Sequence, residues 1–167
     1  QSMVRNMGNT TLFIQGPPGA GKTYLSSHLI LDLLSQGKRV GISSNSHKAI
    51  LNLVAACSQN AEGPIKAVKV GGDKNDSILL KNKEIQHQGS PQKASADYEG
   101  GLIGGTAWFF SRDDMKEKLD YLFIDEAGQV SVANLVGMSP CAENLVLIGD
   151  QMQLQQPLQG THPGESG

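Results

Sequence analysis

The sequence predicts an α/β fold in which helices cover a mainly parallel sheet. Up to residue 70, short apolar runs alternate with stretches of helical periodicity, in the order strand, helix, strand, helix, strand. Residues 16–23, GPPGAGKT, match the pattern G-x-x-x-x-G-K-[ST] between an apolar run and a helix. Two later apolar runs end in acids, at Asp125 and Asp150. Ligands bind at the carboxyl edge of such sheets, so we expect a site there.

The elements before residue 71 follow from periodicity and from helix-start and helix-stop residues. Residues 12–14 form an apolar strand, and 24–36 form a helix that Gly37 ends. Residues 38–43 are the next strand, and N-cap residues precede a helix at 47–57. Residues 65–70, IKAVKV, alternate apolar and charged side chains, which predicts a half-exposed or edge strand.

Residues 71–101 show the weakest pattern in the chain. They are rich in polar residues and glycine, with few apolar anchors. We expect one short helix around 77–88 and a mobile loop at 88–101. The chain is then a single domain, 1–167, with a flexible insertion at 71–101.

Regular structure is expected again after residue 101. The pattern predicts a short strand at 102–108, a polar helix at 111–118 and a buried strand at 120–125. A short helix at 129–136 and a buried strand at 144–148 follow, and the strand leads into Gly149-Asp150.

Composition limits the classes of partner. A net charge of −2 over 167 residues gives no global attraction to nucleic acid or to an anionic membrane, so nucleic-acid binding requires a local surface. No apolar run approaches the roughly 20 residues of a membrane span, and we expect no membrane partner and a cytoplasmic location. Cys57 and Cys141 match no metal spacing and are expected as buried free thiols. Both ends look like cuts within a longer polypeptide.

The loop residues have the chemistry to bind a nucleoside triphosphate. Glycines let the backbone approach phosphate oxygens, and the helix N-terminus adds N–H donors. Lys22 can lie between the β- and γ-phosphates, and the Thr23 hydroxyl can ligate Mg²⁺. The expected contacts to ATP are Gly16, Pro17, Pro18, Gly19, Ala20, Gly21, Lys22, Thr23 and Tyr24.

The acids after the later strands supply the remaining chemistry. We expect the strand ending at Ile124 beside the first strand, so that Asp125 holds Mg²⁺ opposite Thr23. Glu126 is the candidate general base for the attacking water. Gln153, after Gly149-Asp150, is the candidate sensor of the γ-phosphate; an ordinary Gly-Asp turn is the alternative.

Three motifs resemble a known family. GPPGAGKT, FIDEAGQ and IGDQMQL, in that order, resemble motifs I, II and III of superfamily-one helicases, especially the 5′→3′ branch with the nonsense-mediated-decay helicase and the replication helicase-nucleases. NSHKAI, GTAWFF and HPGESG further resemble bacterial fusions of a RecB-like nuclease to such a helicase. The resemblance implies a three-layer, RecA-like P-loop NTPase with helices on both faces of the sheet. It also implies a second RecA-like domain, whose motifs are missing here, and weak hydrolysis by this part alone.

The resemblance also implies a path for single-stranded DNA or RNA. Ser44, Asn45, Ser46 and His47 would bind its phosphates, and ordinary helix capping is the alternative for this segment. Thr106 would contact the backbone and Trp108 would stack on a base, unless Trp108 packs in the core.

Two other functions remain open at this point. A phosphate-loop switch or scaffold that is not a motor would hydrolyse ATP without regard to single strands. A kinase-type enzyme is disfavoured because Glu126 directly after Asp125 suits activation of water, and because no lid-like arginine cluster is present.

Overall fold

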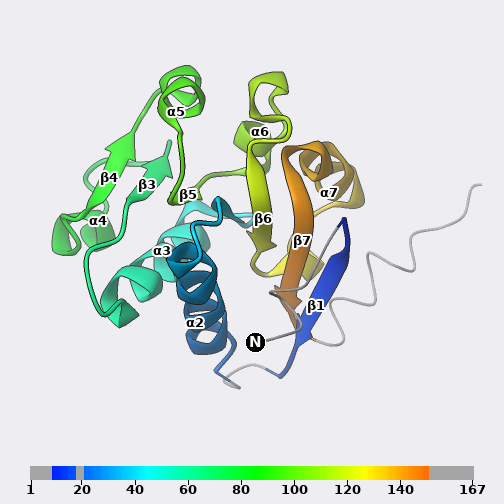
Figure 1. Ribbon diagram of the computed structural model, residues 1–167, viewed down its shortest axis with the longest axis horizontal. Coiled ribbons are helices and arrows are strands. Elements are labelled where there is room, and N and C mark those ends of the chain that lie inside the picture. The colour runs from blue at the N-terminus through cyan, green and yellow to red at the C-terminus, as the bar shows by residue number, and fades with distance from the viewer. Residues whose placement is uncertain (1–8, 18–20, 151–167) are drawn as a thin grey trace, which may run out of the picture.

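The fold is one parallel sheet between two layers of helices. The computed structural model describes residues 9–17 and 21–150, and every structural statement below concerns those residues (Figure 1). The strands are β1 (Thr11–Gln15), β2 (Val40–Ser43), β3 (Ala67–Val70), β4 (Ile85–Gln88), β5 (Leu102–Gly104), β6 (Leu119–Ile124) and β7 (Ala142–Gly149). The α-helices are α2 (Lys22–Ser35), α3 (His47–Asn60), α4 (Ser77–Lys81), α5 (Pro91–Asp97), α6 (Ala107–Phe110) and α7 (Val132–Met138).

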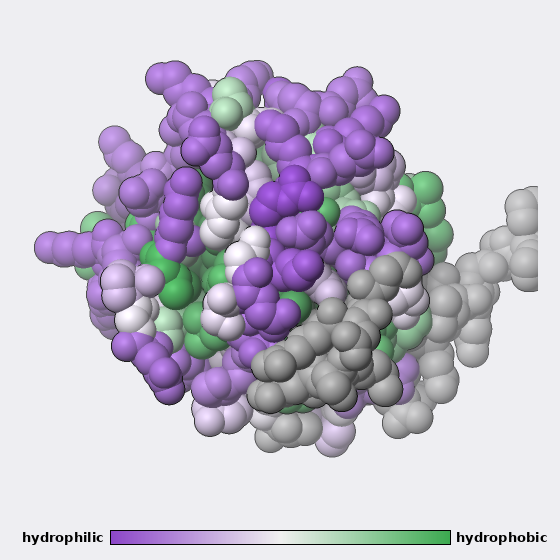
Figure 2. Space-filling view, in the orientation of Figure 1, coloured by the Kyte–Doolittle hydropathy of each residue, from purple (hydrophilic) through white to green (hydrophobic). Residues whose placement is uncertain are grey.

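Each face of the sheet has its own core, as the predicted three-layer α/β fold requires. Alternate residues of β6 point to opposite faces: Tyr121 and Phe123 belong to one buried cluster, and Leu122 and Ile124 to the other. The first cluster contains buried apolar side chains of α2 and α3, and the second contains those of α6 and α7. Hydrophilic residues cover most of the face that Figure 2 shows.

The strand order differs from the expected one at the point that matters most for the site. The described strands follow the order β1-β7-β6-β2-β5-β3-β4, and all their pairings are parallel. We expected β6 directly beside β1, which was wrong. β7 lies between them, pairing with β1 from Thr11 to Gln15 and with β6 from Leu119 to Ile124.

Residues 71–101 contain more regular structure than the sequence predicts. The helix expected at 77–88 ends at Lys81, and β4 follows and pairs with β3. The loop expected at 88–101 contains α5, which Pro91 begins and the Ser90 hydroxyl caps by accepting from the Lys93 N–H. The secondary structure therefore differs from a loop, while flexibility of this segment stays a prediction.

Two further elements, expected at 102–108 and 111–118, are shorter than the sequence predicts. The strand expected at 102–108 ends at Gly104, and residues 107–110 form α6. The helix expected at 111–118 is only the 3₁₀ turn η1 (Asp113–Met115). Its residues are held by short-range bonds such as Met115 N–H to Arg112 O.

The environment of β3 corrects the expectation of a half-exposed or edge strand. β3 lies between β5 and β4 and pairs with both. Lys69, which the alternation places among solvent-facing residues, is fully buried. Burial disfavours the charged ammonium and lowers the pKa of Lys69 to about 8.

Both cysteines are buried free thiols, as predicted. Cys57 lies in α3, and Cys141 lies in the turn η3 (Ser139–Cys141). Burial raises the pKa of each thiol to about 12, which keeps the reactive thiolate scarce at neutral pH. Among the described residues, no helix has the length and apolar character needed to cross a membrane.

The buried lysine predicts a specific dependence of stability on pH. Because the pKa of Lys69 is about 8 in the fold and 10.5 in a reference chain, the unfolded state binds more protons between these values. Lys69 alone should therefore raise the free energy of unfolding with pH across that window, by up to roughly 3 kcal/mol. The buried thiols act in the opposite sense above pH 9, but they do so equally in both proteins. The free energy of unfolding of the wild type, measured by urea denaturation at pH 7 to 10, should therefore rise relative to that of Lys69→Met.

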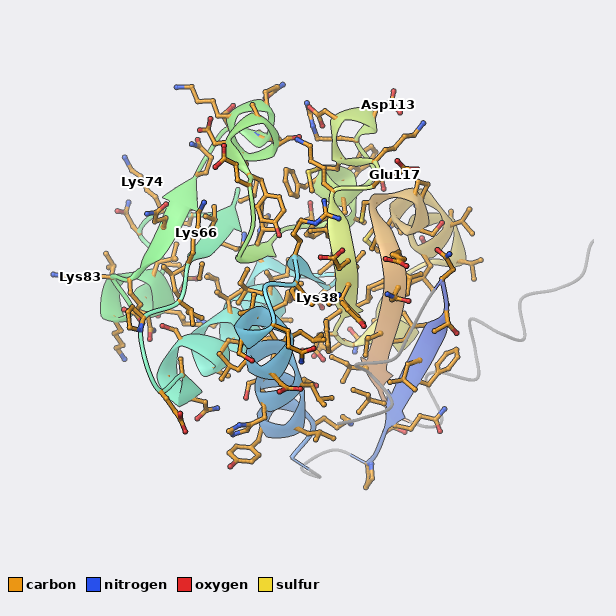
Figure 3. All side chains as sticks on the ribbon, viewed as in Figure 1. Lys38, Lys66, Lys74, Lys83, Asp113 and Glu117 are labelled. Carbon is orange, nitrogen blue, oxygen red and sulfur yellow. The ribbon has the colours of Figure 1, made fainter. Side chains whose placement is uncertain are left out.

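The matched control is Lys66→Met, because Lys66 is an exposed lysine three residues earlier (Figure 3). It should keep the rise. Equal slopes for Lys69→Met and the wild type would contradict the burial of a titrating Lys69.

Candidate nucleotide site and nucleic-acid edge

The phosphate-loop motif lies where β1 ends and α2 begins. The Gly16 N–H donates to the Gly149 carbonyl at 3.3 Å, which ties the start of the loop to the end of β7. Gly21 precedes the helix at φ 75°, a left-handed conformation that favours glycine. Pro18, Gly19 and Ala20 lie outside the described residues.

Lys22 folds back over the loop. Its ammonium lies 2.6 Å from the Gly16 carbonyl oxygen and 3.4 Å from that of Pro17. A phosphate group bound in front of the helix N-terminus would therefore meet this cation and the first backbone N–H groups of α2.

Thr23 and Tyr24 lie in the first turn of α2, and both are exposed. The Tyr24 ring contacts the His28 ring one turn later, with ring centroids 4.3 Å apart and the ring planes tilted by 57°. The contact leaves 64% of Tyr24 exposed.

Asp125 is held at the carboxyl end of β6 by backbone bonds on both sides. Its N–H donates to the Ser43 carbonyl of β2 at 2.8 Å, and its Oδ1 accepts from the Glu126 N–H at 2.9 Å. Burial raises the pKa of Asp125, and the nearby Glu126 carboxylate adds to the rise, while Lys22 opposes it. A half-buried carboxyl that already interacts with Lys22 is suited to meet a second cation at this edge.

Glu126 has a strained backbone. Its φ of 49° and ψ of 44° are left-handed, a region that costs a residue with a side chain roughly 1–2 kcal/mol. Such strain persists only where the surroundings enforce it, and it is common at functional sites. Here the bond to Asp125 and the turn η2 (Ala127–Gln129) impose it.

The insertion of β7 brings a third acid to the same edge. Gln15 pairs with Gly149, so Asp150 follows β7 where the loop follows β1. The sequence predicts Asp150 at the end of a buried strand, but it does not predict that this strand lies between β1 and β6. Gln153, the candidate γ-phosphate sensor, lies outside the described residues.

Residues 44–47 follow β2, which lies next to β6. Their side chains differ in how accessible they are to a ligand. Ser44 is buried, and its hydroxyl donates to the side chain of Asn45 at 3.4 Å. Ser46 caps α3 by accepting from the Ala49 N–H, which confirms the capping bond and leaves a phosphate contact at this residue a prediction. Asn45 and His47 are exposed, and these two side chains remain accessible to a ligand.

Thr106 and Trp108 follow β5, the strand on the other side of β2. Thr106 is the N-cap residue of α6 and makes no side-chain capping bond there. Trp108 is 86% exposed, whereas Phe109 and Phe110 are buried. The core alternative for Trp108 is therefore wrong, and its ring is accessible at the surface.

A contact that the sequence did not predict joins the segment after Asp125 and Glu126 to the segment after β2. Asn45 Nδ2 donates to Gln129 Oε1 at 2.9 Å, which connects the segment after β2 with the turn after Asp125 and Glu126. Gln129 is the last residue of the FIDEAGQ motif, and this position was the only feature of the sequence that pointed to a role for Gln129.

The residues at the edge fit a magnesium ion that is shared with a substrate. Among the described residues, no group of three or more His, Cys, Asp or Glu side chains could hold a metal ion. Mg²⁺ characteristically uses one or two protein oxygens together with waters and substrate phosphates, rather than an all-protein cage. A Thr23 hydroxyl and an Asp125 carboxylate are donors of that kind.

Comparisons with known proteins agree with the motifs. The "DNA replication ATP-dependent helicase/nuclease dna2" of Schizosaccharomyces pombe is 27% identical over 157 residues, covering 92% of this chain and 11% of that protein. The "RecBCD enzyme subunit RecD" of Buchnera aphidicola is 24% identical over 161 residues, covering 92% of this chain and 24% of that protein. This chain therefore spans only a small part of these relatives.

Solved structures share the fold. A nuclease-deletion mutant of the Type ISP restriction-modification enzyme LlaGI, in complex with a DNA substrate mimic, gives a TM-score of 0.60 at 15% identity, covering 90% of this chain and 16% of that one. The UvsW helicase from bacteriophage T4 gives 0.54 at 11% identity, covering 88% and 51%.

These relatives confirm the resemblance to helicases that include the replication helicase-nucleases. A family model described as an AAA domain matches residues 2–162, nearly the whole sequence. The chain therefore belongs to the AAA domain family.

Proposed function

We propose that this chain is the ATP-binding and ATP-hydrolysing motor domain of a nucleic-acid helicase or translocase. One observation carries the proposal: the parallel register brings the phosphate loop, Asp125-Glu126 and residues 44–47 to one edge of the sheet, where Asn45 and Gln129 join them. The named helicase/nuclease relatives support the same function.

Each residue then has a distinct role toward ATP. Residues 16–21 and the first turn of α2 cradle the phosphates, and Lys22 balances their charge. Tyr24 would contact the nucleotide, and Gln153 would sense the γ-phosphate. Glu126 accepts the proton of the attacking water.

Mg²⁺, held by Thr23 and Asp125, would neutralise charge that develops on the β- and γ-phosphate oxygens. The Asp125 carboxyl is suited to this role because a nearby cation favours its ionised form, against the burial that raises its pKa.

The strand path runs across the ends of β2 and β5. Asn45 and His47 would bind phosphates, and Trp108 would stack on a base without regard to sequence. The parent protein would add a second RecA-like domain and, by the same resemblance, a nuclease domain. Arginines from the second domain would supply a large part of the rate, so this part alone should bind ATP and hydrolyse it slowly.

The phosphate site can be tested at Lys22. Lys22→Ala removes a charge-assisted contact to phosphate and should weaken Mg·ATP binding by the chain about 10- to 100-fold. Titration calorimetry checks this. Lys38→Ala, a lysine just beyond the far end of α2 (Figure 3), is the control and should bind like the wild type. Equal affinity for Lys22→Ala would contradict the phosphate site.

A variant of Glu126 separates chemistry from binding. Glu126→Gln keeps the shape of the side chain but cannot accept a proton, so Mg·ATP should bind normally while hydrolysis by the parent protein falls about 10²-fold or more. Single-turnover release of phosphate measures this. Unchanged hydrolysis would remove Glu126 from its role as base.

The strained backbone of Glu126 also predicts a change in stability. Glu126→Gly should relieve the left-handed backbone and raise the free energy of unfolding by about 1 kcal/mol, although it abolishes the base. Urea denaturation beside Glu126→Gln provides the comparison. A less stable Glu126→Gly would show that the carboxylate contributes more to the fold than its backbone costs.

The alternative is a nucleotide-gated switch or scaffold that is not a motor. The exposed Trp108 distinguishes the two functions. In a motor, single-stranded DNA or RNA should stimulate hydrolysis, and Trp108→Ala should weaken strand binding about 10-fold while Trp108→Phe retains most of it. Fluorescence anisotropy with a labelled oligonucleotide checks this. A hydrolysis rate indifferent to single strands would favour the switch.

A further inference from the structure

The buried Lys69 makes a contact that neither the phosphate site nor the sheet requires. Its ammonium lies 2.8 Å from His47 Nδ1, at the start of α3. It also donates to the carbonyls of Val70 at 2.7 Å and Gly71 at 3.1 Å. No carboxylate makes an ion pair with Lys69 among the described residues. A buried cation is thus directed at a histidine of the proposed strand path.

The turn after β3 is shaped around the His47 ring. Gly71 and Gly72 have φ values of 68° and 76°. A Cβ on Gly72 would lie 3.0 Å from His47 Nδ1 and 3.1 Å from its Cγ. The ring therefore packs directly on the backbone of Gly72, where a side chain would displace it.

A second histidine secures this turn from β4. His87 Nε2 lies 3.1 Å from the Gly71 carbonyl and 3.2 Å from the Gly72 carbonyl. Carbonyl oxygens only accept, so His87 must donate from Nε2. The turn that supports His47 is therefore held by donors from Lys69 on one side and from His87 on the other.

Lys69 determines which nitrogen of His47 carries the proton. An ammonium has three donors and no acceptor, so His47 Nδ1 must accept. The neutral ring then carries its hydrogen on Nε2, as a donor. His47 is exposed, and Nε2 has no hydrogen bond within the part of the chain that the structure describes.

We infer that His47, held by Lys69 as the neutral Nε2–H tautomer, donates a hydrogen bond to a phosphodiester oxygen of the bound single strand, with Lys69 as its positioning residue. This inference rests on the proposed nucleic-acid motor. It places the contact beside Asn45, at the end of β2, and extends the path toward β3.

The charges around the ring oppose its protonation. The Lys69 ammonium faces the His47 ring from β3, and His87 interacts with it electrostatically from β4. Lys48 is the next residue in α3, and the Asp76 carboxylate interacts electrostatically with Lys69. Burial lowers the pKa of His47, and the charges of Lys69 and His87 lower it further. A contact through a neutral donor binds phosphate without releasing the counterions that an added positive charge would release.

Nitrogen NMR of the chain tests the tautomer without any nucleic acid. Long-range ¹H–¹⁵N spectra, with His47 assigned by its loss in His47→Gln, should show a protonated Nε2 and an unprotonated Nδ1 in the wild type at pH 7. Lys69→Met should give mixed tautomers and a His47 pKa closer to the ordinary value of about 6.5. A protonated Nδ1 in the wild type would overturn the inference.

Strand binding tests the phosphate contact. The Gln amide can place a donor near the Nε2 position, whereas the shorter Asn side chain reaches only the Nδ1 position. With a labelled oligothymidine, His47→Asn should weaken binding about 10-fold, and His47→Gln should recover most of it. Lys48→Ala, the exposed neighbour, should leave the tautomer of His47 unchanged and serves as the matched control.

The pH profile separates positioning from a structural role. Lys69→Met should bind more tightly as pH falls from 7.5 to 5.5, because its released His47 becomes a cation in that range, whereas the wild type should change little until lower pH. Equal affinities of His47→Asn and the wild type would overturn the inference while leaving the motor intact. A wild-type chain that binds no oligonucleotide, with the predicted tautomer present, would instead count against the proposed function.

Discussion

The parallel register of β1, β7, β6 and β2 is the constraint on which the candidate site depends. Hydrogen bonds across these strands pair Gln15 with Gly149 and Ser43 with Ile124, so the residues that follow them meet at one edge. None of the site residues needs a long loop to reach its neighbours. The sheet itself positions the start of the phosphate loop, the acids and the segment after β2, and the helices on both faces bury its central strands.

Local patterns predicted the parts of the site that are local in sequence. Residues 16–23 and the acids after β6 could be recognised because a glycine-rich turn or a strand that ends in an acid is complete within a few residues. The position of β7 in the sheet could not be recognised in this way, because strand pairing depends on contacts between residues that are far apart in the chain. The two lysines of IKAVKV predicted a half-exposed strand, but they are three residues apart and point to opposite faces. Lys69 shares the face of Ala67, which α3 covers, and the local pattern cannot show that covering.

Two hydrogen-bonded links connect the phosphate side with the strand side. Asn45 and Gln129 join side chains across the ends of β2 and β6, and the bond from the Asp125 N–H to the Ser43 carbonyl joins their backbones. Glu126 sits between these links in a conformation that its own side chain disfavours. A change in the turn after β6 would therefore displace Asn45 directly through these hydrogen bonds, and not through the packing of the core.

β1 carries the phosphate loop at the outer side of the described sheet, where it pairs only with β7. Its residues are exposed or half-buried, unlike the buried β2. Such a strand opens locally at a lower free energy than the centre of the sheet, so its amide hydrogens exchange sooner. A ligand held at residues 16–23 binds only the closed form, and by mass action it slows that opening. The peripheral position of β1 thus makes amide exchange along this strand a direct gauge of occupancy.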